Sequence, residues 1–420
     1  CICTSARFNF KMSRKVWFRN IGPGALVAAA FVGPGTVTLC TLAGVGFGFD
    51  LLWAMALSIF ATIALQEMAA RLGLVTQRGL AEVVRAEISH PVVNRFMMFL
   101  ILAAIVVGNA AYQAGNISGG SLGLEALAGQ HHLTVFSQPV NLITLIMGAI
   151  AFLILYFGNY KALEKVFITL VVLMSFSFVL AAIATKPSLG LIAKGLLQPK
   201  SPDGSFLTIV GLIGTTVVPY NLFLHASLVK EKWSGLKDLK AVRIDTTISI
   251  ILGGVVSMAI IISASAANLT DVHSAADLAE ALAPLYGEYA KSFLAVGLFA
   301  AGITSAITAP LAAAFVAKGC LGFNGNMHSR AFRLVWMFVL LFGVLLSSFG
   351  VKPIEIIQFA QIANGFLLPL IAGVLLWVVN KKTVLGKFVN TKTQNIIGMA
   401  ILLLSLSLGL KAILKALGAI

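Results

Sequence analysis

Charged side chains are rare in this chain. Asp, Glu, Lys and Arg make up 11% of its 420 residues, whereas hydrophobic residues make up 59%, and the mean hydropathy is +0.97. A soluble domain of this length would need far more polar surface. A soluble globular fold is therefore excluded, and the lipid bilayer must act as solvent and partner.

Cysteines and catalytic motifs are scarce as well. The four cysteines, Cys1, Cys3, Cys40 and Cys320, show no paired spacing, which argues against a disulfide framework and a zinc site. The sequence contains no P-loop, and no nucleophile–base pair or metal-ligand cluster placed at a cleft. Neither an enzyme nor a bound cofactor is expected.

Long apolar runs are abundant. Eleven runs can cross roughly 30 Å of hydrocarbon as helices that rise about 1.5 Å per residue. The runs cover residues 20–45, 50–70, 95–118, 140–157, 163–184, 206–228, 244–268, 290–317, 334–350, 354–380 and 394–416. Only short loops remain, so the predicted fold class is an all-α polytopic membrane protein with 11 transmembrane helices.

Lys and Arg gather in one of the two sets of loops. The stretches 119–139 and 269–289, on the opposite side, contain neither residue. Because basic loops stay in the cytoplasm, the segment 1–19 is predicted to be cytoplasmic and the carboxyl terminus to lie outside. Residues 1–11 precede a candidate natural start at Met12 and are left out of the fold prediction as candidate non-native sequence.

The net charge of +15 is dispersed over many loops. Such a distribution reflects topology and does not indicate a nucleic-acid partner. A bacterial cytoplasmic membrane fits this pattern. The sequence leaves the oligomeric state open, a monomer included.

Two apolar runs carry a proline near the middle of the membrane. Proline lacks an N–H group and clashes with the preceding turn, and flanking glycines weaken a helix further, so both runs should break. Broken backbone must face protein or a water-filled cavity. The breaks are Gly33-Pro34-Gly35-Thr36 in the first run and Thr215-Thr216-Val217-Val218-Pro219-Tyr220-Asn221 in the sixth.

The spacing of the breaks, five spans apart, points to a 5+5 inverted repeat with a substrate site at the midplane. The predicted repeats are 20–184 and 206–380, followed by an eleventh span at 394–416. The alternative is a pair of proline kinks that serve packing only.

Several motifs, in order, resemble those of the NRAMP divalent-metal transporters, over nearly all of residues 14–416. The resemblance implies a LeuT-type fold. The matching segments are Gly22-Pro23-Gly24, the two breaks with Leu222-Phe223-Leu224-His225, 69–76 with 80–83, 159–165, 243–248 and 301–308.

The break residues depart from the family pattern. The resemblance implies that a first-span Asp and Asn, a sixth-span Met sulfur and a nearby carbonyl bind a largely dehydrated metal. The side-chain positions here are Gly33, Thr36 and Val218, and the carbonyl position is Thr215. Without the carboxylate and the soft sulfur, tight binding of bare manganese or iron is not supported.

Neutral oxygens remain at the breaks. Magnesium usually keeps several waters, so a roomy oxygen-lined site suits the hydrated ion, and the chain resembles the NRAMP-related magnesium transporters in this respect. The candidate metal ligands, acting through water, are Thr36, Thr215 and Asn221. The predicted substrate-binding set is Gly33, Pro34, Gly35, Thr36, Thr215, Thr216, Val218, Pro219, Tyr220 and Asn221.

Proton coupling is expected to be lost. Asn109 and Tyr112 occupy third-span positions where the family carries acidic relay residues, and Tyr220 replaces a motif histidine. None of these side chains titrates usefully near neutral pH. The hypothesis is passive, uncoupled transport of a divalent cation, magnesium or manganese.

Four further polar residues are candidates for gating or for lining the pathway together with Asn109 and Tyr112: Gln66, His225, Gln361 and Asn364. An interhelical hydrogen bond would explain His225 equally well, and helix-end capping would explain Gln66. The acidic residues Glu67, Glu82, Glu164 and Asp245 are expected to form cytoplasmic ion pairs.

Two other functions stay open on sequence grounds. Because no acidic residue lies at the breaks and two half-helix amino termini do, an anion or a small zwitterion is an alternative substrate. A non-transporting sensor is the other alternative, although no signalling domain is visible.

Overall fold

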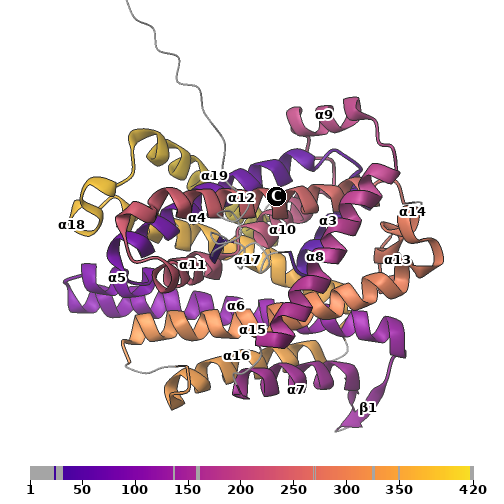
Figure 1. The fold of residues 1–420 in the computed structure, drawn as a ribbon, viewed down its shortest axis with the longest axis horizontal. Coiled ribbons are helices and arrows are strands. Elements are labelled where there is room, and N and C mark those ends of the chain that lie inside the picture. The colour runs from indigo at the N-terminus through magenta and orange to yellow at the C-terminus, as the bar shows by residue number, and fades with distance from the viewer. Residues whose placement is uncertain are drawn as a thin grey trace, which may run out of the picture.

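The structure is a computed structural model that describes residues 23–24, 32–135, 138–157, 161–267, 269, 271–323, 327–348 and 351–416. Figure 1 shows a bundle of long helices, with α3, α10, α11 and α17 in its interior. In the described part of the chain, nine helical segments are long and apolar enough to cross a membrane.

Within the described residues, each of the eleven predicted spans contains a helix or part of one. The nine long segments comprise α4 (Leu52–Thr76), α6 (Pro91–Ala128), α8 (Lys161–Ala184), α10 (Phe206–Thr216) with α11 (Pro219–Lys232), α12 (Leu239–Ala264), α15 (Ala290–Leu321), α16 (Arg330–Ser348), α17 (Pro353–Val379) and α19 (Lys392–Ala416). Two shorter apolar helices, α3 (Pro34–Phe47) and α7 (Leu142–Phe157), fall in the first and fourth predicted spans. The chain is an integral multi-pass protein.

Short elements connect the spans. They are α5 (Leu80–Glu87), α9 (Leu189–Leu197), α13 (Ala275–Glu280), α14 (Ala283–Tyr286), α18 (Lys382–Leu385) and the 3₁₀ turns η1 (Leu236–Asp238), η2 (Gly287–Tyr289) and η3 (Gly386–Phe388). One antiparallel hairpin departs from the all-α prediction: β1 (His132–Val135) pairs with β2 (Gln138–Asn141), His132 opposite Asn141. Between spans, such a hairpin satisfies backbone groups locally.

Helices α6 and α15 are longer than their predicted spans and run side by side (Figure 1). α6 has 38 residues and α15 has 32. Glycines allow the two backbones to approach closely, since a Cβ added to Gly302 would lie 2.5 Å from Gly120 Cα. Close packing of small residues is a common basis of helix association in membranes.

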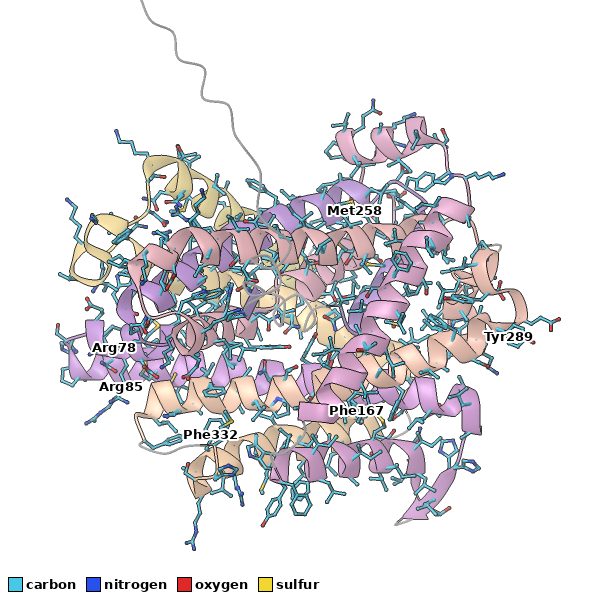
Figure 2. All side chains as sticks on the ribbon, viewed as in Figure 1. Arg78, Arg85, Phe167, Met258, Tyr289 and Phe332 are labelled. Atoms are coloured by element: carbon cyan, nitrogen blue, oxygen red, sulfur yellow. The ribbon has the colours of Figure 1, made fainter. Side chains whose placement is uncertain are left out.

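Polar and apolar surfaces are distributed as a bilayer requires. Phe96, Phe99 and Phe176 are among the large apolar side chains exposed on the outer helices. Arg78 and Arg85 lie at one end of the bundle, whereas Tyr289 lies at the other (Figure 2). The exposed apolar belt therefore belongs in lipid, as the composition predicted.

Candidate substrate site

The predicted break in the sixth span is confirmed. Helix α10 ends at Thr216 and α11 begins at Pro219. Val217 (φ −91°, ψ 69°) and Val218 (φ −75°, ψ 120°) are not helical. Because residue 219 has no N–H, the Thr215 carbonyl cannot receive the usual i+4 hydrogen bond of a helix. Its oxygen is left for another partner.

The structure describes only the second half of the first break, where α3 begins. Val32 and Gly33 form a bend, and α3 begins at Pro34, with Gly33 extended at φ −113° and ψ −171°. Residues 25–31, the other half of this span, lie outside the described residues. Both α3 and α11 thus begin with a proline at N1, and neither N-cap, Gly33 or Val218, supplies a side-chain cap.

A pair of hydroxyls joins the two breaks. Thr36 Oγ1 lies 2.9 Å from Thr215 Oγ1, although 179 positions separate the two residues. Both side chains are at most 1% exposed. The breaks therefore meet in the interior, as a shared midplane site requires.

Helix α17 closes one side of this junction. A Cβ added to Gly35 would overlap the Gln361 side chain, and one added to Gly214 would overlap the Gln361 backbone. Gln361 and Asn364 are each 1% exposed, and Gln361 Oε1 and Asn364 Nδ2 have no hydrogen-bond partner in the described structure. Both predicted pathway residues of the tenth span are thus buried, and Gln361 touches the first break.

The Asn221 side chain lacks hydrogen-bond partners for both of its amide atoms, Oδ1 and Nδ2, among the described residues. Asn221 lies in the first turn of α11 and is 1% exposed. An unsatisfied buried polar atom costs about 1–3 kcal/mol. A buried amide without a partner, directly after a helix break, indicates a position where a polar ligand could bind.

The third-span candidates take different positions. Tyr112 packs edge-on against Tyr220, with 5.4 Å between ring centroids. Asn109 donates its amide to the Ala309 carbonyl of α15 at 2.8 Å. Asn109 therefore holds α6 to α15, whereas Tyr112 reaches the second break.

Two other members of the predicted set offer no free polar group. Thr216 Oγ1 lies 2.9 Å from the Leu212 carbonyl and 3.6 Å from Met55 Sδ, so its hydroxyl is directed toward its own helix and α4. Val218 is fully buried and apolar. Fewer residues of the predicted set can therefore offer an oxygen atom to a substrate than the sequence indicated.

Gln66 and His225 form one buried chain of polar groups. His225 Nδ1 lies 2.9 Å from Gln66 Oε1, and His225 Nε2 lies 3.5 Å from Thr246 Oγ1. Gln66 lies well inside α4, so the interpretation of Gln66 as a helix-end cap is wrong. The hydrogen-bond interpretation of His225 is confirmed, and the pair ties α4 to α11.

Three of the acidic residues for which ion pairs were predicted, Glu67, Glu82 and Asp245, have partners outside the two breaks. The end of the bundle that carries Arg78 and Arg85 is called the basic end below. Glu67 pairs with Arg71 at 3.1 Å and with Arg243 at 2.8 Å, and Glu82 pairs with Lys230 at 3.5 Å. These pairs confirm the ion-pair prediction for Glu67 and Glu82. Asp245 accepts a hydrogen bond from the Gly24 amide at 2.8 Å. The Glu164 side chain lies outside the described residues.

The site itself is neutral. In the described residues, no group of three or more His, Cys, Asp or Glu side chains could hold a metal ion. A cation at the breaks would therefore meet hydroxyl, amide and carbonyl oxygens. These are hard ligands, which suit magnesium or manganese better than soft metals.

Residues 24–415 match the protein family described as Natural resistance-associated macrophage protein-like, Nramp. The chain belongs to the Nramp family. It is similar to the divalent metal cation transporter MntH of Yersinia pestis, at 28% identity over 409 residues covering 94% of each chain. It is also similar to MntH of Klebsiella pneumoniae subsp. pneumoniae, at 29% identity over 408 residues covering 95% of this chain and 94% of that protein.

Solved structures share the fold of this Nramp chain. The Eremococcus coleocola manganese transporter matches with a TM-score of 0.76 at 21% identity, covering 96% of this chain and 88% of that one. Mhp1, a nucleobase-cation-symport-1 family transporter, matches with a TM-score of 0.57 at 14% identity, covering 94% and 93%. The predicted family resemblance and LeuT-type fold are confirmed.

One polar residue that lies against the first break was not predicted as a site residue from the sequence. Ser305 of α15 is 1% exposed, and its Oγ would lie 3.0 Å from a Cβ added to Gly33. Ser305 appeared only within the motif 301–308. A lone serine among small residues carries no sequence signal of its neighbour, since contacts between distant spans cannot be deduced from spacing.

Proposed function

We propose that this Nramp protein is a secondary transporter of divalent metal cations, with hydrated magnesium or manganese as its substrate. The observation that carries the proposal is the Thr36–Thr215 hydroxyl pair, which joins the two helix breaks. The Asn221 amide in the first turn of α11, which has no partner among the described residues, supports it. The names of the MntH relatives support a divalent metal cation as cargo.

The donor set favours a cation that keeps part of its water shell. Hydroxyl and amide oxygens are hard but uncharged ligands, and magnesium gives up water reluctantly. Thr36, Thr215 and Asn221 would hold the first-shell waters by hydrogen bonds, and the Thr215 carbonyl would add a negative dipole. The neutral site would bind weakly, which favours release.

Transport requires a change of conformation, because the break residues Thr36, Thr215 and Asn221 are buried. Alternating access would be achieved by rocking the repeat 20–184 against the repeat 206–380, with 394–416 as an added span. We further propose a bacterial cytoplasmic membrane, an inside amino terminus, and uncoupled transport, because Asn109, Tyr112 and Tyr220 cannot relay protons near neutral pH.

The test is metal flux into proteoliposomes, with magnesium, manganese and calcium compared and the lumenal pH read at the same time. Entry of magnesium or manganese without acidification of the lumen would support the proposal. Acidification in step with entry would reject uncoupled transport. If no divalent cation enters, the proposal that the substrate is a divalent cation is rejected. An anion or zwitterion substrate, or a sensor function, would then have to be tested, although the family relationship does not favour them.

A further inference from the structure

The hydroxyl of Ser305 behaves differently from its neighbours on α15. Thr304 donates to the Ala300 carbonyl at 2.7 Å, and Thr308 donates to carbonyls one turn earlier at 3.2 Å. Such bonds to the preceding turn are the usual solution for a hydroxyl inside a helix. Ser305 Oγ is buried and has no partner among the described residues.

This hydroxyl is aimed at the first break. A Cβ placed on Gly33 would lie 3.0 Å from Ser305 Oγ and 4.0 Å from Ser305 Cβ, and among the described residues no other non-neighbouring atom would lie within 4 Å. Gly33 has an extended conformation that any residue can adopt, with φ −113° and ψ −171°. Backbone geometry therefore does not require glycine here, and a side chain at residue 33 would meet the Ser305 hydroxyl.

We propose that Ser305 is a specificity-determining residue of the substrate site. The inference rests on the proposed function. Its hydroxyl takes the space that a side chain at residue 33 would use, and it presents a neutral oxygen to the hydrated cation. Thr36 follows Gly33 by three residues and lies against Thr215 of α10. In this proposal α3, α10 and α15 would each supply one hydroxyl to the site: Thr36, Thr215 and Ser305.

The Ser305 hydroxyl can bind substrate because it has no hydrogen-bond partner among the described residues. Ser305 Oγ is left to accept a hydrogen bond from a cation-bound water or to bind the cation directly. A hard oxygen at this place favours magnesium over softer ions. Loss of one such hydrogen bond should raise KM about two- to tenfold and should reduce the preference for magnesium over manganese.

The test compares Ser305→Ala, Gly33→Ala and the double variant with wild type in proteoliposome uptake of magnesium and manganese. Ser347→Ala is the matched control, since Ser347 of α16 is buried but donates to the Gly343 carbonyl at 2.8 Å. Metal-induced stabilisation of each purified protein, read as a shift in Tm, supplies a measurement that is independent of flux.

The expected result is a higher KM and a smaller Tm shift by magnesium for Ser305→Ala, and wild-type values for Ser347→Ala. Gly33→Ala should also raise KM, because its methyl group would push the hydroxyl away. In the double variant the clash is gone, yet KM should stay at least as high as in Ser305→Ala, because the oxygen is missing.

Two outcomes would overturn the inference while leaving the proposed function intact. One is wild-type KM and selectivity in Ser305→Ala. The other is recovery of wild-type KM in the double variant, which would mean that the hydroxyl only fills space. A wild-type protein that neither transports a divalent cation nor gains Tm from one would instead overturn the proposed function, and this inference with it.

Discussion

At the scale of single residues, the proposed substrate site should sacrifice stability for binding. Both amide atoms of Asn221 are buried without a partner among the described residues, which costs about 1–3 kcal/mol for each unsatisfied group. An apolar group of similar shape removes this cost. Asn221→Leu should therefore keep Tm at or above the wild-type value, while uptake of magnesium or manganese falls at least about tenfold.

Asn109→Leu is the matched control for that experiment. Asn109 is as buried as Asn221, but its amide donates to the Ala309 carbonyl at 2.8 Å. Removing it breaks this hydrogen bond between α6 and α15 and should lower stability by about 0.5–1.5 kcal/mol. Thermal unfolding in detergent distinguishes the two variants, and a fall in Tm for Asn221→Leu as large as that for Asn109→Leu would contradict the prediction.

At the scale of helices, the sixth-span break depends on one proline. With Ala at residue 219, an N–H becomes available to the Thr215 carbonyl, and α10 and α11 can join into one continuous helix. Pro219→Ala should therefore depress uptake about tenfold or more. Proteoliposome uptake measures the effect.

Pro310→Ala is the control, since Pro310 lies inside α15 and does not end that helix. It should keep uptake near the wild-type level. Equal uptake by Pro219→Ala and wild type would mean that the break is fixed by the surrounding helices.

The α6–α15 contact gives a second prediction at this scale. A Cβ at Gly302 would lie 2.5 Å from Gly120 Cα and 2.6 Å from Gly120 N, where only backbone movement can make room. Gly302→Ala should lower the yield of folded protein and its Tm, by at least about 1–3 kcal/mol in stability. In Gly373→Ala, the nearest atom would be Leu402 Cδ1 at 3.8 Å, so this control should be neutral. Size-exclusion profiles and thermal unfolding compare the two.

What could be predicted from the sequence differs between elements. The breaks at Pro34 and Pro219 could be predicted from proline in apolar runs. This local rule is not sufficient by itself, because Pro310 and Pro369 lie inside α15 and α17 without ending those helices. The pairing of Gln66 with His225 and of Ser305 with Gly33 could not be predicted, because each pair is brought together by the packing of distant spans. The β1–β2 hairpin was missed because its strands have four residues each and β2 overlaps the start of the apolar run 140–157.

For the whole molecule, one network of charged groups joins α4, α12 and the segment before α19. Glu67 of α4 pairs with Arg71 and with Arg243 of α12, and Arg71 also donates to Asn390 and to the Phe388 carbonyl. Arg71 is 1% exposed, so it depends on these partners. This network should help to close the basic end of the pathway.

Glu67→Gln should therefore favour opening at the basic end. In a background without the native cysteines, a cysteine placed at Thr36 should react with a membrane-impermeant thiol reagent about tenfold faster when Glu67→Gln is added, because a charged hydrogen bond of about 1.5–3 kcal/mol is lost. The reagent is applied from the basic end. Glu355→Gln is the control: its pair with Lys352 is mostly exposed, at 57% and 67%, and lies at the start of α17. Such pairs contribute little, so equal acceleration by both variants would mean that the network does not control access.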